Sequence, residues 1–196
     1  MNRTNIAFVI CKSEFKNWNG GISYLRNLIN LIKNLKELKI HIFTDNKNFV
    51  RKKISKDIQI TEENILKKNN LFYFFRKIII FFLKKDLLLF YLLKKRKISV
   101  LSHRRLFINK EIKSIGWIPD LQQKVMKKYF DKKNYILREN YVLNEIKNSD
   151  IIFVSSNQIK KEFKKFYNLD KKIIALRIPS ILKKRMYKNF SKKKYI

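Results

Sequence analysis

Residues 114–123 read Ser-Ile-Gly-Trp-Ile-Pro-Asp-Leu-Gln-Gln, an apolar run that ends in a rigid and polar exit. Pro119 locks its own backbone torsion and favours an extended Ile118, so residues 112–118 are typical of a strand that stops just before Asp120. A strand that serves only the core does not need such an exit. The stretch therefore predicts a buried strand whose carboxyl end lies at the lip of a cleft.

The start of the chain has a related pattern. Residues 5–11 are a continuous apolar run, as in the central strand of a parallel sheet, and a polar loop then leads to Gly20-Gly21. From Gly21 to about Lys36 apolar residues recur at helical spacing. Strand, loop, glycine pair and helix together predict a βα unit.

The rest of the chain continues this alternation. Further strands are predicted at residues 39–44, 57–61, 97–102, 150–154 and 172–176, and helices at 62–96, 121–130, 136–148 and after Ser155-Ser156, with the apolar stripe Ile159, Phe163 and Phe166. This order predicts an α/β fold with a Rossmann-like, mostly parallel sheet flanked by helices, in which ligands bind at the carboxyl ends of strands. We expect residues 1–180 to form this domain and residues 181–196 to be a basic tail or a truncated interdomain linker.

The composition indicates one domain in a reducing compartment. The 196 residues are 45% hydrophobic, which supplies a core without disulfides. Cys11 is the single cysteine and lies in an apolar run, so we interpret it as a small buried hydrophobe. The start of the sequence has no signal-peptide pattern, and no window reaches the roughly 18 uncharged residues of a spanning helix. The predicted location is the cytoplasm, with peripheral contact to the inner membrane face as an addition.

The formal charge of +32 comes from 47 basic and 15 acidic residues, an excess that favours binding to polyanions or to anionic lipid. The lysines are spread along the whole chain, and the few glycines and prolines are typical of AT-rich coding. We therefore expect no specific nucleic-acid partner. Residues 71–93 interleave aromatic and aliphatic side chains with basic ones, which fits either a membrane interface or a pair of helices packed on the sheet.

Two candidate catalytic residues follow predicted strands. Asp120 has a carboxylate that orients an acceptor hydroxyl or acts as a base, and its alternative role is the N-cap of the next helix. His103 ends the strand at 97–102, where it either contacts a sugar or acts as a base, or is a surface histidine. The two roles of Asp120 are compatible with each other.

Other candidates lie where helices begin. Gly20 and Gly21 form either an anion-binding helix N-terminus or a plain tight turn. Ser155 and Ser156 are expected to cap a helix, with Gln158 completing a capping box with Ser155, and to contact a ligand as an addition. No Walker loop, metal-binding cluster or nucleophile elbow is recognisable, so the sequence predicts no metal and no bound cofactor.

The order of these motifs resembles the N-terminal domain of GT-B glycosyltransferases of family 4. The matching residues are Gly20-Gly21 before a helix with Tyr24-Leu25 and Asn27-Leu28, then Gly116-Trp117-Ile118-Pro119-Asp120-Leu121-Gln122, Arg138, and Ser149 to Ser156. Family members with a Trp-x-Pro-Asp-x-Gln-His element build bacterial surface polysaccharides, and this chain has Gln123 where they often have His.

The resemblance implies a two-domain enzyme whose N-terminal half holds the acceptor and whose C-terminal half binds the nucleotide sugar. It implies substrate contacts for Gly20, Gly21, Trp117, Gln122, Arg138, Ser155 and Ser156. The family's donor domain has two glutamates eight positions apart, and no two glutamates of this chain have that separation. The expectation is an acceptor-side domain that is inactive alone and transfers sugar to a glycan or lipid-linked acceptor when another chain supplies the donor domain.

Two alternatives stay open at this stage. One is a noncatalytic basic domain that binds a membrane surface or polyanions and keeps the fold without the reaction. The other is the remnant of a truncated gene. Salt-sensitive lipid binding without dependence on a sugar nucleotide favours the first alternative.

Overall fold

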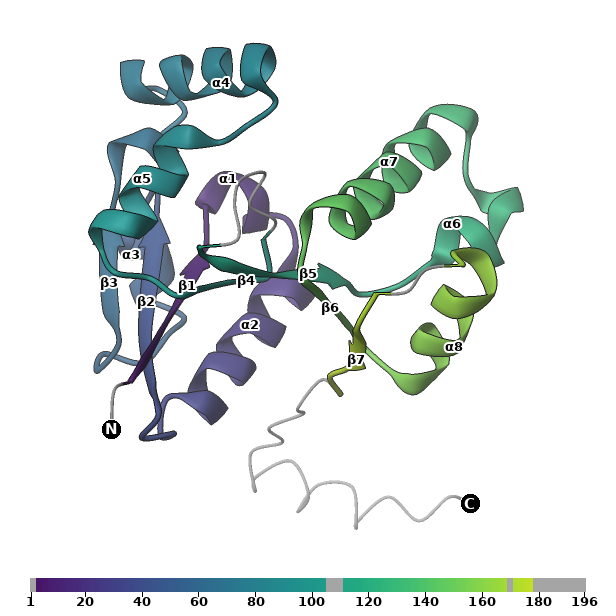
Figure 1. Ribbon diagram of the computed structural model, residues 1–196, viewed down its shortest axis with the longest axis horizontal. Coiled ribbons are helices and arrows are strands. Elements are labelled where there is room, and N and C mark those ends of the chain that lie inside the picture. Colours follow the sequence, from purple (N-terminus) through teal and green to yellow (C-terminus); the bar gives the residue numbers. More distant parts are fainter. Residues whose placement is uncertain (1–2, 105–110, 169–170, 178–196) are drawn as a thin grey trace, which may run out of the picture.

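The computed structural model describes residues 3–104, 111–168 and 171–177 (Figure 1). In this part of the chain seven strands form one sheet in the order β3-β2-β1-β4-β5-β6-β7, with every neighbouring pair parallel. The strands are β1 (Thr4–Val9), β2 (Leu38–Thr44), β3 (Gln59–Glu62), β4 (Val100–Ser102), β5 (Lys113–Ile118), β6 (Ile151–Val154) and β7 (Ile173–Ala175). The predicted α/β, Rossmann-like fold is confirmed. The predicted tail at 181–196 lies outside the described residues.

Helices connect these strands in the described part of the chain. They are α1 (Lys12–Phe15), α2 (Asn19–Ile32), α3 (Lys47–Arg51), η1 (Asn64–Leu66), α4 (Leu71–Leu83), α5 (Leu87–Lys95), α6 (Gln122–Val125), η2 (Lys127–Tyr129), α7 (Lys132–Asn148) and α8 (Asn157–Phe166). The loop predicted between the first strand and Gly20 contains the short helix α1. Helix α7 begins four residues before the predicted start because Asp131 caps it, accepting a hydrogen bond from the Asn134 amide at 2.7 Å.

Two helical predictions need correction. The region 62–96 is not one helix: Glu62 ends β3, the short turn η1 follows, and α4 begins only at Leu71. Helices α4 and α5 are separate because Lys84 adopts a left-handed φ of 53° and Asp86 then caps α5. The helix predicted at 121–130 is wrong: α6 ends at Val125, and a separate turn, η2, follows. Val125, Met126 and Tyr129 are all exposed, so no buried apolar face supports a longer helix there.

The two faces of the sheet are covered by different helices. Ile6 and Phe8 of β1 pack with α2 and α3, whereas Ala7 and Val9 pack with η1 and α5. At the far end of the sheet α7 and α8 pack on Ile118, Ile152 and Val154, and the predicted stripe of α8 joins this cluster. Figure 1 shows α2 below the sheet and α7 above it.

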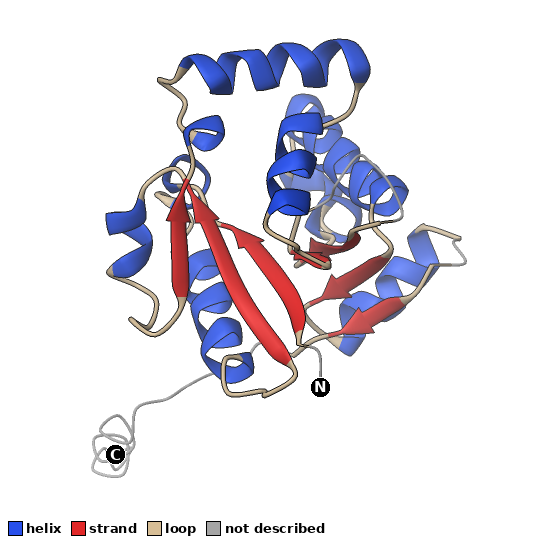
Figure 2. Cartoon of the chain, turned by 60° about the vertical axis from the view of Figure 1, so that its left-hand side comes forward, coloured by secondary structure: helices blue, strands red, loops and turns tan. Residues whose placement is uncertain are grey.

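The strand order places a cleft. The chain runs outward from β1 through β2 to β3 and then returns to the other side of β1 with β4, so the direction of winding reverses between β1 and β4. Ligands of open parallel sheets bind outside the carboxyl ends of strands at such a reversal. Helix α4 crosses the sheet at this same end, and its ribbon lies apart from the ends of the strands (Figure 2).

Candidate functional site

A cleft of about 550 Å³ lies at the carboxyl ends of β1 and β4. Its wall includes residues from the loop after β1, from α4, from the end of β4, from β5 and from α7. The lining side chains used below are Cys11, Glu14, Trp18, Arg76, His103, Arg104, Trp117, Tyr141 and Glu145. A cleft of this size at this edge is the expected position for a small-molecule site.

Aromatic rings form one wall of the cleft. Tyr24 stacks on Trp117 with ring centroids 4.6 Å apart, and Trp18 stacks on Trp117 at 5.2 Å. Trp117 is buried, whereas 43% of Trp18 is exposed, so Trp18 is the most exposed of these three rings. Phe15 of α1 stacks on Trp18 at 5.7 Å, so Trp18 lies between Phe15 and Trp117. The exposed part of the indole therefore presents an apolar surface to a ligand.

The glycine pair supports this wall. Gly20 and Gly21 lie in the first turn of α2, as predicted. A Cβ atom added to Gly21 would lie 2.5 Å from the Trp18 ring, whereas one added to Gly20 would meet its nearest atom, Trp18 Nε1, at 3.8 Å. The indole thus packs directly on the first turn of α2 and covers its backbone at Gly21. This contact is a structural reason for the second glycine.

His103 sits among these rings with both nitrogens engaged. Its Nδ1 is 2.8 Å from Ser102 Oγ and its Nε2 is 3.0 Å from the Tyr24 hydroxyl. Burial lowers the pKa of His103 to about 3 and raises the pKa of Tyr24, so the imidazole is neutral and the phenol protonated near neutral pH. The backbone of His103 is left-handed, with φ at 60°. The ring is held in one position and is a weak base.

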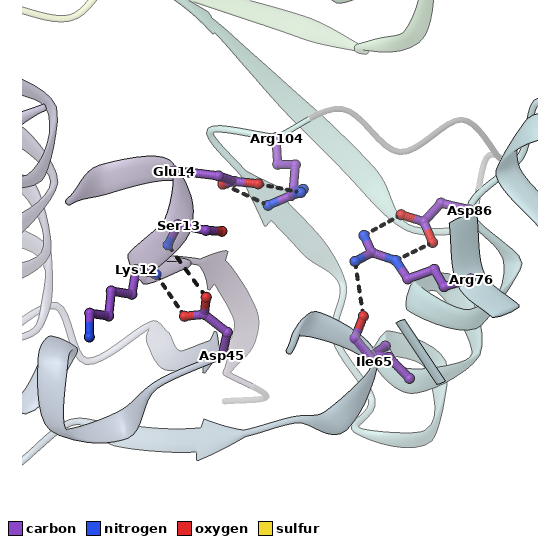
Figure 3. Close-up of polar contacts among 8 residues, drawn as sticks. All are labelled: Lys12, Ser13, Glu14, Asp45, Ile65, Arg76, Asp86 and Arg104. Atoms are coloured by element: carbon purple, nitrogen blue, oxygen red, sulfur yellow. Dashed lines mark hydrogen bonds and ion pairs between the residues drawn. The ribbon is translucent and has the colours of Figure 1, made fainter. Parts of the chain in front are cut away.

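Two ion pairs border the cleft (Figure 3). Arg104 donates to both carboxylate oxygens of Glu14, at 3.0 and 3.2 Å, and Arg76 donates to both oxygens of Asp86, at 2.6 and 2.8 Å. Burial lowers the pKa of Arg104, but the charges of Glu14, Cys11 and Asp86, together with the hydrogen bond to Glu14, outweigh burial, and the pKa is raised. The Arg104 guanidinium therefore remains charged.

Asp45 fixes the loop that carries Glu14. Its carboxylate, which follows β2, accepts hydrogen bonds from the amides of Lys12 and Ser13 at 2.6 and 3.4 Å (Figure 3). The first amides of a short helix need such partners because the helix itself supplies none. The carboxyl end of β2 thus holds α1 beside the end of β1.

Cys11 lines the cleft as a buried and unreactive thiol. Burial, followed by the charge of Glu14, raises its pKa to about 12. Since the thiolate is the nucleophilic form, this cysteine stays protonated and inert near neutral pH. The prediction of a small buried hydrophobe is confirmed, with 4% of the residue exposed.

Asp120 and Arg138 form a separate group beyond β5. Arg138 donates hydrogen bonds to Asp120 Oδ1 and, at 3.4 Å, to Gln123 Oε1. Asp120 Oδ1 also accepts from the Gln122 amide at 3.2 Å, so it holds the first turn of α6 without occupying the N-cap position, which belongs to Leu121. None of the residues that line the 550 Å³ cleft in the described structure comes from this group.

The serine pair has structural partners. Ser155 donates to the Pro119 carbonyl at 2.6 Å, which joins the exits of β5 and β6. Ser156 is the N-cap of α8 and accepts from the Ile159 amide at 3.2 Å. The predicted capping box of Ser155 and Gln158 is wrong by one residue, since Gln158 donates to Glu162 instead. Ser155 follows the end of β6 at Val154, and its hydroxyl donates to the Pro119 carbonyl, so the next residue, Ser156, caps the helix.

Sequence reasoning missed several cleft residues. Glu14 and Trp18 were assigned only to a polar loop, although their position after the first strand is a usable signal for the carboxyl edge. Tyr141 and Glu145 come from the middle of α7, and Tyr141 donates to the Trp117 carbonyl at 2.6 Å. Gly116 allows α7 to pack closely on β5, because a Cβ on Gly116 would lie 2.6 Å from Glu145 Oε2. Within the described chain no three metal-ligating side chains come together.

Comparison with known proteins shows the fold. No protein-family model matches the sequence, and no curated protein matches it. The structure is similar to UDP-N-acetylglucosamine 2-epimerase, with a TM-score of 0.54 and 14% identity over 89% of this chain and 48% of that chain. A glycosyltransferase from Rickettsia africae gives a TM-score of 0.45 and 14% identity over 97% and 49% of the two chains. A UDP-glucosyltransferase from Polygonum tinctorium gives 0.48 and 8% over 99% and 58%.

The chain spans about half the length of the first of these structures, 48%. At this level of identity the likeness to the 2-epimerase shows a Rossmann-like domain of the GT-B type. Fold likeness alone does not carry activity from one protein to another.

Proposed function

We propose that this domain is the acceptor-binding half of a glycosyltransferase, which acts when a domain that binds a nucleotide sugar faces the cleft. The observation that carries the proposal is the cleft itself, which combines stacked aromatic rings with carboxylates and a neutral histidine at the carboxyl edge of the sheet. The apolar face of a sugar ring packs well on an indole, and its hydroxyls need hydrogen-bonding partners around the rim. The structural neighbour that shares this fold is, by its name, an enzyme that acts on a sugar nucleotide.

The residues divide into contact and orientation roles. Trp18 offers the exposed apolar contact surface, and Phe15 and Trp117 support it by stacking. His103 has a pKa near 3 and bonds Ser102 and Tyr24 through its two nitrogens, so it does not remove the acceptor's proton and instead holds Tyr24 in place in the cleft wall. Asp120, at the exit of β5, is the candidate carboxylate that orients the acceptor hydroxyl or acts as a base. The residues that hold this exit in place are Gln122, Arg138, Ser155 and Ser156.

The reaction depends on a second domain in this proposal. The nucleotide sugar binds to that domain, and the acceptor, a glycan or a lipid-linked sugar, binds in the cleft. Closing the two domains on each other excludes water and places the acceptor hydroxyl against the donor sugar. No resident metal or cofactor is part of the proposal.

Acceptor binding is tested on the 196-residue chain by saturation-transfer NMR with a panel of mono- and oligosaccharides. We expect weak binding that is lost in Trp18→Ala, because the exposed part of its ring is the contact surface, and that is unchanged in Leu31→Ala, an exposed apolar residue on α2. Equal signals from the wild type and Trp18→Ala would contradict the assignment of the cleft.

Transfer is tested by mixing the chain with a separately expressed domain that binds a nucleotide sugar and supplying UDP-sugars with the bound saccharide. Activity only in the mixture supports a split transferase. Conversion of UDP-N-acetylglucosamine without an acceptor would instead indicate epimerase chemistry. An inert mixture together with salt-sensitive lipid binding would leave the noncatalytic basic domain as the better account.

A further inference from the structure

Helix α4 is built with its apolar side toward solvent. Eight of its thirteen residues are large hydrophobic side chains that are exposed, namely Leu71, Phe72, Phe74, Phe75, Ile78, Phe81, Phe82 and Leu83. Leu71, Phe74, Phe75, Ile78 and Phe82 follow one another at intervals of three, one, three and four, so they share one side of the helix, which we call the outer face. A helix that packs on a core has its apolar stripe inward, as α2 has.

The inward side of α4 is fixed by charge. Arg76 and Asp86 form a paired contact with only 6% and 8% of their side chains exposed, and Arg76 also donates to the Ile65 carbonyl at 3.2 Å. Tyr73 and Ile80, one turn before and one turn after Arg76, line the cleft. Rotating α4 to bury the outer face would break the buried ion pair and leave an unpaired buried charge, which is strongly unfavourable. The exposure of the outer face is therefore held in place.

The surroundings of the outer face are positively charged. Between Glu63 and Asp86 the sequence contains no acidic residue. Lys68, Lys77, Lys84 and Lys85 are exposed beside the helix, two of them directly after its end. An apolar strip flanked by lysines is complementary to a surface with an apolar interior and anionic groups at its edge.

We propose that the outer face of α4 docks into the headgroup region of an anionic lipid bilayer. Its aromatic side chains enter the acyl boundary, and Lys84 and Lys85 contact lipid phosphates. In the described chain no helix has the length and hydropathy to span a bilayer, and the 13 residues of α4 are about 20 Å long, so the helix lies in the plane of the interface.

A second copy of this chain is a poorer occupant of the outer face. Each copy has a formal charge of +32, and a symmetric contact through α4 would bring the same lysines together. Because Tyr73, Lys77 and Ile80 of α4 line the cleft, docking through the opposite side leaves these cleft-lining residues facing away from the lipid. The docking proposal does not depend on the proposed transferase activity.

The test is flotation of the purified chain with two kinds of vesicle, phosphatidylcholine alone and phosphatidylcholine with about one third phosphatidylglycerol. We expect binding to the anionic vesicles and at least a tenfold weaker partition for the double variant Phe75→Asn and Phe82→Asn. The matched control is Leu31→Asn with Leu35→Asn, two exposed leucines on and after α2, which should bind like the wild type. Lys84→Gln with Lys85→Gln should weaken binding more than the equal charge change Lys160→Gln with Lys161→Gln on α8.

Depth of insertion gives a second measurement. Phe82→Trp places a reporter on the outer face, and lipids brominated on the acyl chain should quench its added fluorescence. Unchanged vesicle binding in the Phe75 and Phe82 double variant, or no quenching of the reporter, would overturn the proposal. Dimerisation of the wild type that the same double variant abolishes, without vesicle binding, would assign the outer face to a second copy instead.

Discussion

Trp18 connects the backbone of α2 to the surface of the cleft. Its ring lies against Gly21 and stacks on both Phe15 and Trp117. These contacts do not follow from a helix or strand pattern, because Trp18 precedes α2 and belongs to no regular element. The position of the Trp18 ring therefore depends on the absence of one side chain, at Gly21.

Gly21→Ala is predicted to destabilise the protein by about 1–3 kcal/mol, because the new Cβ would lie 2.5 Å from the Trp18 ring and force it to move. Gly20→Ala is the matched control, since its Cβ meets only ordinary contacts and alanine favours helix by up to about 1 kcal/mol. Urea denaturation followed by tryptophan fluorescence measures both. Equal stability of the two variants would show that Trp18 does not rest on Gly21.

His103 makes stability depend on pH. The unfolded imidazole titrates near 6.5 and the native one near 3, so between these values the unfolded state binds more protons. Stability from this group is complete above pH 6.5 and is lost as the pH falls through the window. Between pH 7 and pH 4 we expect a loss of about 3 kcal/mol.

The measurement is urea denaturation of the wild type and His103→Gln at several pH values. The two curves should converge toward low pH, because only the wild type loses this contribution. Burial, with Lys39 and Arg96, also lowers the pKa of His41, which adds a slope of the same sign to both proteins, so the difference isolates His103. Parallel curves for the two proteins would contradict the prediction.

At the scale of elements, the region from α4 to α5 shows where periodicity is insufficient. The apolar residues of 71–93 fit either a membrane interface or helices packed on the sheet. The structure separates the two halves: α5 buries Leu89, Phe90 and Leu93, whereas α4 exposes its apolar residues. The difference is set by Arg76 and Asp86, ten residues apart, which pair across the turn between the helices.

Asp86→Asn is predicted to cost about 3–5 kcal/mol, since it leaves Arg76 buried without its counter-charge. Amides of α4 should exchange hydrogen faster than in the wild type, because the pair attaches α4 to α5. Glu111→Gln is the control, as it removes an exposed pair with Lys94 and should cost less than about 1 kcal/mol. If both variants are equally stable, the buried pair does not hold the helix.

At the scale of the whole molecule, the large positive net charge is the dominant property, and the ion pairs of the fold do not offset its repulsion. A formal charge of +32 on 196 residues produces self-repulsion in the compact state. The ion pairs in the described structure are mostly exposed, and such pairs contribute little to stability. The protein is therefore less stable at low ionic strength than its core alone would allow.

Raising NaCl from about 20 mM to 500 mM should increase Tm by about 3–6 °C, because the Debye length shortens and like charges are screened. Differential scanning calorimetry at constant pH measures the change. A Tm that falls or stays constant would mean that favourable ion pairs outweigh the repulsion. Lys160→Gln with Lys161→Gln should reduce the salt dependence slightly.

The sequence by itself determined the α/β class, the positions of all seven described strands and the presence of polar groups at their carboxyl ends. These features depend on local patterns: apolar runs, helical spacing, and glycine or proline at element ends. Helix boundaries were predicted less accurately than strand positions, as at residues 121–130, because the length of a short helix depends on what it packs against.

Only the tertiary structure decided which of those polar groups share a cleft. Tyr24 and His103 are 79 residues apart and Glu14 and Arg104 are 90 apart, and they meet because β4 returns to the side of β1 opposite β2. Asp120 ends a neighbouring strand and yet pairs with Arg138 outside the cleft lining. Local periodicity specifies which residues lie on a face or at an end, whereas strand order and side-chain packing specify which ends come together.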